Sequence, residues 1–177
     1  PELVGFDLAG AETGYPPSLH ANALRYARER GINLTIHASE PPDIELIEDA
    51  LRHGAQRIGH GVRITSDITT QHGADVLGPV AQQVRDGRVA LEMAPSCHVQ
   101  IGAVPSFDAH PFVRLMRLGF VVTVNTDNRL MSNVSVTSET VALAETFDLG
   151  WDDLEQIAVN GAQAAFVPDE RRRRLVD

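Results

Sequence analysis

The 177-residue sequence has a single cysteine, Cys97, a deficit of basic residues and no long hydrophobic run. One cysteine excludes an intrachain disulfide, which fits a reducing compartment, and we expect a cytoplasmic protein. No apolar stretch approaches the roughly 18 residues of a membrane span, so we expect no membrane partner. The net charge of −9 disfavours binding to nucleic acid, so we expect no such partner. The one basic run, Arg171 to Arg174, is interpreted as the solvated face of a terminal helix.

The start of the chain also lacks an initiator methionine and a signal-peptide pattern. The first residues, Pro1 to Gly5, read as a strand already under way. We therefore expect the chain to begin inside a longer protein, as one piece of a single domain covering residues 1–177.

Short apolar strands alternate with amphipathic helices along the whole sequence. Strands are expected at residues 3–8, 33–37, 57–60, 88–93 and 120–125, helices at 18–30, 43–53, 76–86 and 111–118, and further helices from 136 onward. This alternation predicts parallel βαβ units. Both a doubly wound open sheet and a (β/α)₈ barrel satisfy the pattern.

Polar residues at the strand ends favour the barrel. Asp7, His37, His60, Glu92 and Asp127 all lie at or near the carboxyl end of a predicted strand. Barrel enzymes gather their active sites from several such ends. An open dinucleotide-binding sheet needs a glycine-rich phosphate loop after its first strand, and the glycines in this region have the wrong spacing for it.

These residue types suit metal-assisted hydrolysis. His37 can supply an imidazole nitrogen to zinc, and Asp127 can supply a carboxylate oxygen from another strand. Zinc lowers the pKa of a water that it binds to near 7. Glu40 is placed to give a proton to the substrate, and His60 to orient or deprotonate the water.

The sequence resembles the adenosine deaminase family of metal-dependent amidohydrolases at four motifs in order: Gly5–Glu12, His37–Glu40, Arg57–Gly61 and Asn125–Asn128. Leu91–Ser96 resembles the motif between the last two. The resemblance implies an α/β fold, a partial TIM (β/α)₈ barrel of approximately strands 4–8 with their helices. It also implies a zinc cofactor and a small-molecule purine nucleoside as substrate.

The resemblance assigns a role to individual residues. His37 and Asp127 are implied as zinc ligands, Glu40 as the acid that protonates purine N1, and His60 as the residue that positions the hydrolytic water. Asp127 is also counted among the catalytic residues. Substrate binding is assigned to three residues, with Gly10 at purine N3 and Asn128 at N7: Asp7, Gly10 and Asn128.

The chain also departs from the family pattern. The family's other two zinc ligands form an H-x-H pair at the end of the first barrel strand, and no two of the seven histidines have that spacing. We therefore expect a missing N-terminal segment of the same barrel, or a partner chain, to complete the site. Ser39 stands where the family more often has glycine, and glycine is also frequent near Asn133. The segment Ala94–His98 replaces a more usual Cys-Pro-Thr-Ser-Asn; extra metal ligation by Cys97 and His98 is weighed against a simple loop substitution, which is favoured.

The leading hypothesis is zinc-dependent deamination of adenosine and 2′-deoxyadenosine to inosine and 2′-deoxyinosine. One alternative is deamination of another 6-aminopurine nucleoside, such as aminofutalosine. Another is a non-catalytic fragment or paralogue, because the H-x-H ligands are absent from the sequence. A cysteine-ligated zinc deaminase is excluded, since that design needs a P-C-x-x-C motif.

Overall fold

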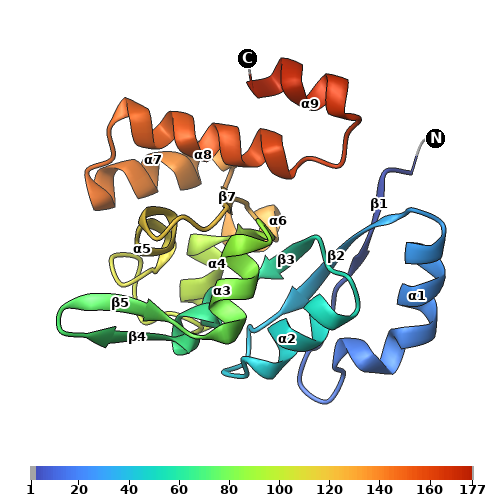
Figure 1. Ribbon diagram of the computed structural model, residues 1–177. Helices are drawn as coiled ribbons and strands as arrows, with labels where there is room; N and C mark the ends of the chain where they lie inside the picture. The colour runs from blue at the N-terminus through green and yellow to red at the C-terminus, as the bar shows by residue number, and fades with distance from the viewer. Residues whose placement is uncertain (1–2, 177) are drawn as a thin grey trace.

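The computed structural model describes residues 3–176. Its main sheet, drawn in Figure 1, has the spatial strand order β1-β2-β3-β6-β7. These strands span Gly5–Leu8, Asn33–Ala38, Arg57–His60, Ala90–Met93 and Val122–Val124. Every neighbouring pair in this sheet is parallel, which confirms the predicted βαβ architecture. Within the described residues β1 and β7 are the edge strands of the sheet.

Helices connect the strands and cover the sheet. They are α1 Ala21–Glu29, α2 Glu45–Arg52, α3 Pro79–Asp86, α4 Pro95–Gln100, α5 Phe112–Arg117, α6 Arg129–Ser132, α7 Val136–Phe147, α8 Trp151–Ala164 and α9 Asp169–Val176. A 3₁₀ turn, η1 Pro17–His20, precedes α1, and another, η2 Val62–Asp67, follows β3. Figure 1 shows α1 and α2 beside β2, and α7 and α8 stacked near β7, which both contact. In the part of the chain described, no helix is long and apolar enough to cross a membrane.

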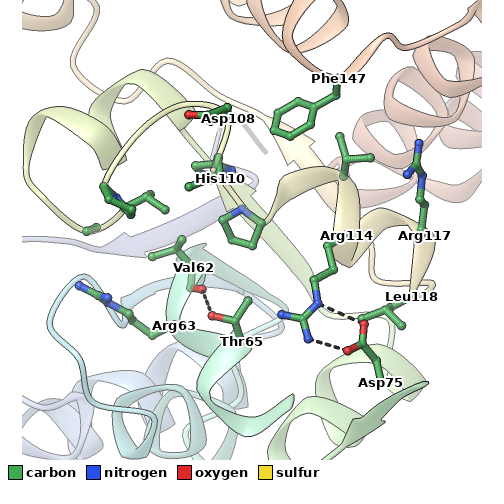
Figure 2. Close-up of a pocket in the computed structure, with 16 residues that line it drawn as sticks. Val62, Arg63, Thr65, Asp75, Asp108, His110, Arg114, Arg117, Leu118 and Phe147 are labelled. Atoms are coloured by element: carbon green, nitrogen blue, oxygen red, sulfur yellow. Dashed lines mark hydrogen bonds and ion pairs between the residues drawn. The ribbon is translucent and has the colours of Figure 1, made fainter. Parts of the chain in front are cut away.

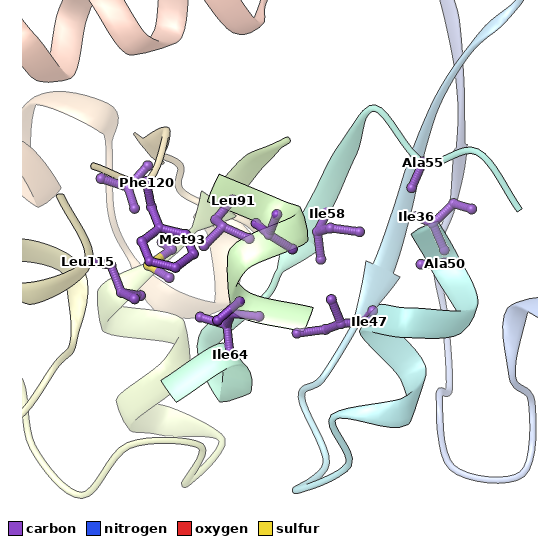
Figure 3. Close-up of a cluster of buried hydrophobic side chains, with 14 of the residues drawn as sticks. Ile36, Ile47, Ala50, Ala55, Ile58, Ile64, Leu91, Met93, Leu115 and Phe120 are labelled. Atoms are coloured by element: carbon purple, nitrogen blue, oxygen red, sulfur yellow. The ribbon is translucent and has the colours of Figure 1, made fainter. Parts of the chain in front are cut away.

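The two faces of the sheet differ in chemistry because successive side chains of a strand point to opposite sides. One face carries Ile36, Ile58 and Leu91, all with no exposed surface. Figure 3 shows these side chains against Ile47 of α2 and Leu115 of α5, within one hydrophobic cluster. The opposite face is polar, and its residues are Asp7, Thr35, His37, Arg57, Glu92 and Thr123.

A half-buried ion pair connects residues of the polar face. Arg57 Nε lies 2.9 Å from Glu92 Oε1, and also donates to Thr35 Oγ1 at 2.9 Å. Burial raises the pKa of Glu92, although the guanidinium of Arg57 opposes that rise. Helices cover the apolar face of the sheet, as helices cover the outside of a parallel barrel.

The predicted helix at residues 76–86 is present, but its predicted start is wrong. An antiparallel hairpin, β4 Ile68–Gln71 and β5 Ala74–Leu77, precedes α3, which begins at Pro79. His72 and Gly73 form its two-residue turn with φ of 52° and 80°, as a type I′ turn demands. The sequence signal was weak because histidine is not a usual first residue of such a turn.

Helix α4 was also missed by the sequence prediction, which left residues 94–98 as a loop. Pro95 occupies the first turn of this helix, where its missing N–H costs no hydrogen bond. The helix turns Cys97 and His98 into the protein, and both are buried. The terminal helix α9 bears out the other local interpretation, since Arg171, Arg173 and Arg174 are exposed on it.

Candidate active site

The carboxyl ends of the parallel strands meet at one edge of the sheet. His37 lies near the end of β2, His60 ends β3, and Asp127 follows β7. Of the residues predicted from the sequence, the structure brings Asp7, His37, Glu40 and His60 into one connected group. Gly10 lines a cavity together with His37, and Asn128 donates a hydrogen bond to Asp127; within residues 3–176 neither hydrogen-bonds to this group.

His37 occupies space that a glycine leaves open. It pairs in register with Gly59 of β3, and a Cβ at position 59 would lie 2.5 Å from the imidazole. Nε2 of His37 lies 3.6 Å from Asp7 Oδ2. This carboxylate raises the pKa of His37, although burial opposes the rise. Asp7, predicted to bind substrate, is therefore also the partner of the expected metal ligand.

His60 is buried and faces two polar partners with the same nitrogen. Its Nε2 lies 3.0 Å from His37 Nδ1 and 3.1 Å from Glu40 Oε1. Burial and the nearby His37 lower the pKa of His60 to about 4. The ring is therefore neutral at pH 7, with one nitrogen that donates and one that accepts.

A second carboxylate, Glu12, holds the backbone that carries Glu40. Glu12 Oε2 accepts the N–H of Ser39 at 2.6 Å and that of Glu40 at 3.2 Å. Burial raises the pKa of Glu12 despite these bonds. Partial burial also raises the pKa of Glu40, which suits a proton donor. Glu12 lies within the motif Gly5–Glu12, but its sequence context indicates no role; only the fold shows its hydrogen bond with Ser39, across 27 positions.

Asp127 is held by residues of α4 and of its own loop. The thiol of Cys97 donates to Asp127 Oδ2 at 2.9 Å, and Asn128 Nδ2 donates to the same oxygen at 3.2 Å. Burial and Asp127 raise the pKa of Cys97 to about 12, so the sulfur keeps its proton at neutral pH. Ser132 Oγ, from α6, donates to Asn128 Oδ1 at 2.9 Å. The amide predicted to contact N7 is thus engaged with protein groups.

Three residues of the site have left-handed backbones that non-glycine residues rarely adopt. Ser39, His60 and Asp127 have φ of 77°, 67° and 50°. Each such conformation costs on the order of 1–3 kcal/mol, and such residues cluster at functional sites. Ser39, which stands where the resembling family more often has glycine, thus has a backbone conformation that glycine adopts more readily. Asn133 also has a positive φ, 52°, at the C-terminal cap of α6.

A cavity of about 330 Å³ opens beside the strand ends. Gly10, with φ of 133°, lines it together with His37, Glu12 and Tyr15. A larger cavity of about 690 Å³, drawn in Figure 2, is lined by residues of η2, by Asp75 of β5 and by residues of α5. Arg114 spans its wall with two hydrogen bonds to Asp75, at 3.1 and 2.7 Å. None of the residues predicted to act in catalysis lines the larger cavity, so the smaller one is the better substrate candidate.

Two different groups of side chains have the chemistry of metal ligands. Atoms of Glu12, Glu40 and His60 lie within 4.8 Å of one another. The sequence instead predicted His37 and Asp127. We favour the predicted pair, because the carboxylate oxygens of Glu12 already accept backbone N–H groups. Asp127 also lies close enough to His37 to raise its pKa.

A family model described as Adenosine deaminase matches residues 1–177. Among curated relatives, the adenosine deaminase of Mycolicibacterium vanbaalenii is 49% identical over 177 residues, which cover 99% of this chain and 49% of that protein. The adenosine deaminase of Mycobacterium leprae is 46% identical, with the same coverage. The chain thus spans about half the length of the curated relatives it matches.

Solved structures match the fold over a similar share. The crystal structure of an adenine deaminase from Arthrobacter aurescens has a TM-score of 0.89 and 27% identity, covering 98% of this chain and 50% of that one. An amidohydrolase from Burkholderia ambifaria with bound Zn has a TM-score of 0.78 and 23% identity, covering 95% and 45%. The sheet therefore corresponds to about half of a deaminase TIM barrel, as the sequence predicted.

Proposed function

Because the chain belongs to the adenosine deaminase family, we propose that it supplies acid and metal-binding groups for hydrolytic deamination of adenosine and 2′-deoxyadenosine. The reaction consumes one water and yields inosine or 2′-deoxyinosine plus ammonia. One observation carries the proposal: the strand ends bring the imidazole of His60 within hydrogen-bonding distance of both the His37 imidazole and the Glu40 carboxylate.

Glu40 acts on the substrate ring in this proposal. Carbon C6 of adenine is a poor electrophile until N1 is protonated. The raised pKa of Glu40 favours its protonated form, which can donate to N1. Glu12 fixes the position of that acid through the backbone of Ser39 and Glu40. His60, on the adjacent strand, holds the attacking water within reach.

The family resemblance implies a zinc cofactor, the similar amidohydrolase from Burkholderia ambifaria contains Zn, and the side chains present here fit part of a zinc site. We propose His37 and Asp127 as two ligands, since an imidazole and a carboxylate are donors that zinc accepts. The hydrogen bond from Cys97 orients the Asp127 carboxylate. A catalytic zinc has three or more protein ligands, so further ligands come from outside these 177 residues. When bound, zinc makes water acidic enough to act at neutral pH.

A second candidate substrate class is another 6-aminopurine nucleoside, such as aminofutalosine. The observation that favours it is α4, where Cys97 and His98 contact Asp127 and His60 directly. Because the resemblance gives this segment a different usual sequence, the groups beside the reacting centre are altered. A panel of aminopurine nucleosides tests this directly: a higher kcat/KM for a substrate other than adenosine favours the second candidate.

The test of the proposal uses the complete protein that contains this chain. We expect elemental analysis to find one zinc per active site. We also expect the protein to convert adenosine to inosine, which a change in ultraviolet absorbance monitors. Glu40→Gln is expected to lower kcat by about 10²- to 10⁴-fold, the usual contribution of a general acid. Glu48→Gln, on the exposed side of α2, is the matched control and is expected to keep the rate.

A non-catalytic protein gives a different pattern. It contains no zinc, and no aminopurine nucleoside in the panel is converted at a rate that depends on Glu40. That result contradicts the proposed function and supports a binding or regulatory role for the same fold.

A further inference from the structure

Three buried imidazoles form a continuous line leading away from the candidate active site. His60 Nδ1 lies 3.0 Å from His98 Nε2, and His98 Nδ1 lies 2.9 Å from His110 Nε2. The three residues come from β3, α4 and the segment before α5. Their exposed fractions are 3%, 0% and 3%. The last ring, His110, also borders the cavity of Figure 2.

A backbone amide fixes the direction of this line. The N–H of Phe112 donates to His110 Nδ1 at 3.2 Å. An amide nitrogen can only donate, so Nδ1 of His110 is the accepting nitrogen and its ring proton is on Nε2. That proton is donated to His98 Nδ1, which places the proton of His98 on its own Nε2. The same logic makes Nδ1 of His60 an acceptor and leaves the proton of His60 on Nε2.

His98 and His110 must be neutral for this assignment to hold, because a protonated ring donates from both nitrogens. Among residues 3–176, no carboxylate is a hydrogen-bond partner of either ring, and both rings are almost completely buried. Burial lowers the pKa of His98 to about 2 and that of His110 to about 4. Each ring therefore has one donor and one acceptor at neutral pH.

We propose that His98 and His110 are positioning residues that hold His60 in the tautomer with its proton on Nε2, the nitrogen facing Glu40 and His37. His60 then presents a hydrogen-bond donor to the active site. The catalytic consequence rests on the proposed function: His60 orients the oxygen of the attacking water by donating to it. In this tautomer Nε2 has no free lone pair, so His60 is not the base that deprotonates the water. The sequence had left both roles open.

Nuclear magnetic resonance tests the tautomers without any assay of activity. The complete protein, labelled with ¹⁵N-histidine, is studied by long-range ¹H–¹⁵N correlation near pH 7. We expect Nε2 of His60, His98 and His110 to be of the protonated, pyrrole type and each Nδ1 to be of the unprotonated type. A protonated Nδ1 on His98 or His60, or an imidazolium at either position, overturns the inference.

Two substitutions at position 98 separate hydrogen bonding from packing. His98→Gln keeps an N–H donor toward His60 Nδ1, whereas His98→Leu removes it. We expect the glutamine variant to retain the His60 spectrum and the leucine variant to move it toward a mixture of tautomers. His72→Gln, in the exposed hairpin turn, is the control and leaves the His60 signals unchanged. Equal His60 spectra in the glutamine and leucine variants overturn the inference.

Kinetics then tests the link to catalysis. If the protein deaminates adenosine, His98→Leu lowers kcat by about 10- to 100-fold, the usual effect of losing a residue that orients an active-site group. KM changes little, and His98→Gln restores most of the rate. An equal kcat in His98→Leu and His98→Gln overturns the proposed link between the His60 tautomer and catalysis. If the wild type has the expected tautomers and converts no aminopurine, the proposed function fails while the tautomer assignment stands.

Discussion

Replacing Gly59 by alanine tests whether the sheet register creates the position of His37. Gly59 lies directly opposite His37 in the pairing of β2 with β3. An added Cβ would lie 2.5 Å from Cδ2 and 2.9 Å from Cγ of the imidazole, closer than real contacts allow. The ring is therefore expected to move away from its present place at the strand ends.

Two opposing effects set the change in stability. Gly59 has the extended backbone of a strand, where alanine is favoured over glycine by roughly 0.5–1 kcal/mol. To reach ordinary contact at 3.4 Å, the ring must withdraw by roughly 0.9 Å, and forced overpacking costs about 1–3 kcal/mol. We expect the free energy of unfolding to fall by up to about 2 kcal/mol. A catalytic group misplaced by about 1 Å can lower activity about 10²-fold.

Chemical denaturation of the complete protein measures the first effect, and zinc titration with adenosine turnover measures the second. Gly161→Ala in α8 is the matched control, because a Cβ there meets nothing within 4 Å. That variant is expected to gain up to about 1 kcal/mol from helix propensity and to keep its zinc affinity. If Gly59→Ala is stabilised as much as the control and binds zinc equally well, the argument that glycine makes room for His37 is refuted.

Three further changes test other parts of the site. Cys97→Ala removes the thiol that donates to Asp127; zinc affinity is expected to fall about 10-fold or more, with partial recovery in Cys97→Ser, by calorimetric titration. Ser39→Gly removes the strain of a φ of 77° but loses a side-chain hydrogen bond. The free energy of unfolding, measured by urea denaturation, should therefore change by less than about 1 kcal/mol, whereas Ser39→Val should lower it by more than that. His98 and His110 have pKa values lowered from 6.5 to about 2 and about 4; the unfolded chain therefore binds more protons as pH falls below 6.5, and stability declines. Each imidazole contributes about 1.4 kcal/mol per pH unit between pH 6 and 5, so the stability of His98→Gln should depend less steeply on pH over that range.

The sequence predicted the parallel strands well because their pattern is local. Each main strand has apolar side chains on the face that helices cover, and the alternation of such short segments with amphipathic helices can be read from neighbouring residues. The strand-end positions of His37 and His60 followed directly, since a strand's last residues are visible in the sequence. The hairpin of β4 and β5 was missed because its turn depends on His72 in a left-handed conformation, which composition does not reveal.

The active-site partners depend on contacts between distant segments. Glu12 reaches Ser39 across 27 positions, and His98 reaches His60 across 38. Nothing in either local sequence indicates such a pairing, because it depends on how β1, β3 and α4 are placed in space.

The sequence by itself determined which residue types stand at the ends of parallel strands, and thereby led to the hypothesis of a metal-assisted hydrolase chemistry for His37, Glu40 and Asp127. Only the tertiary structure decided how those groups are held. Glu12 accepts the backbone N–H of Ser39 next to Glu40, Cys97 donates to Asp127, and a line of buried imidazoles begins at His60. The physical reason is that neighbouring residues determine where a strand forms, whereas the partner and direction of a hydrogen bond depend on which groups the fold buries together.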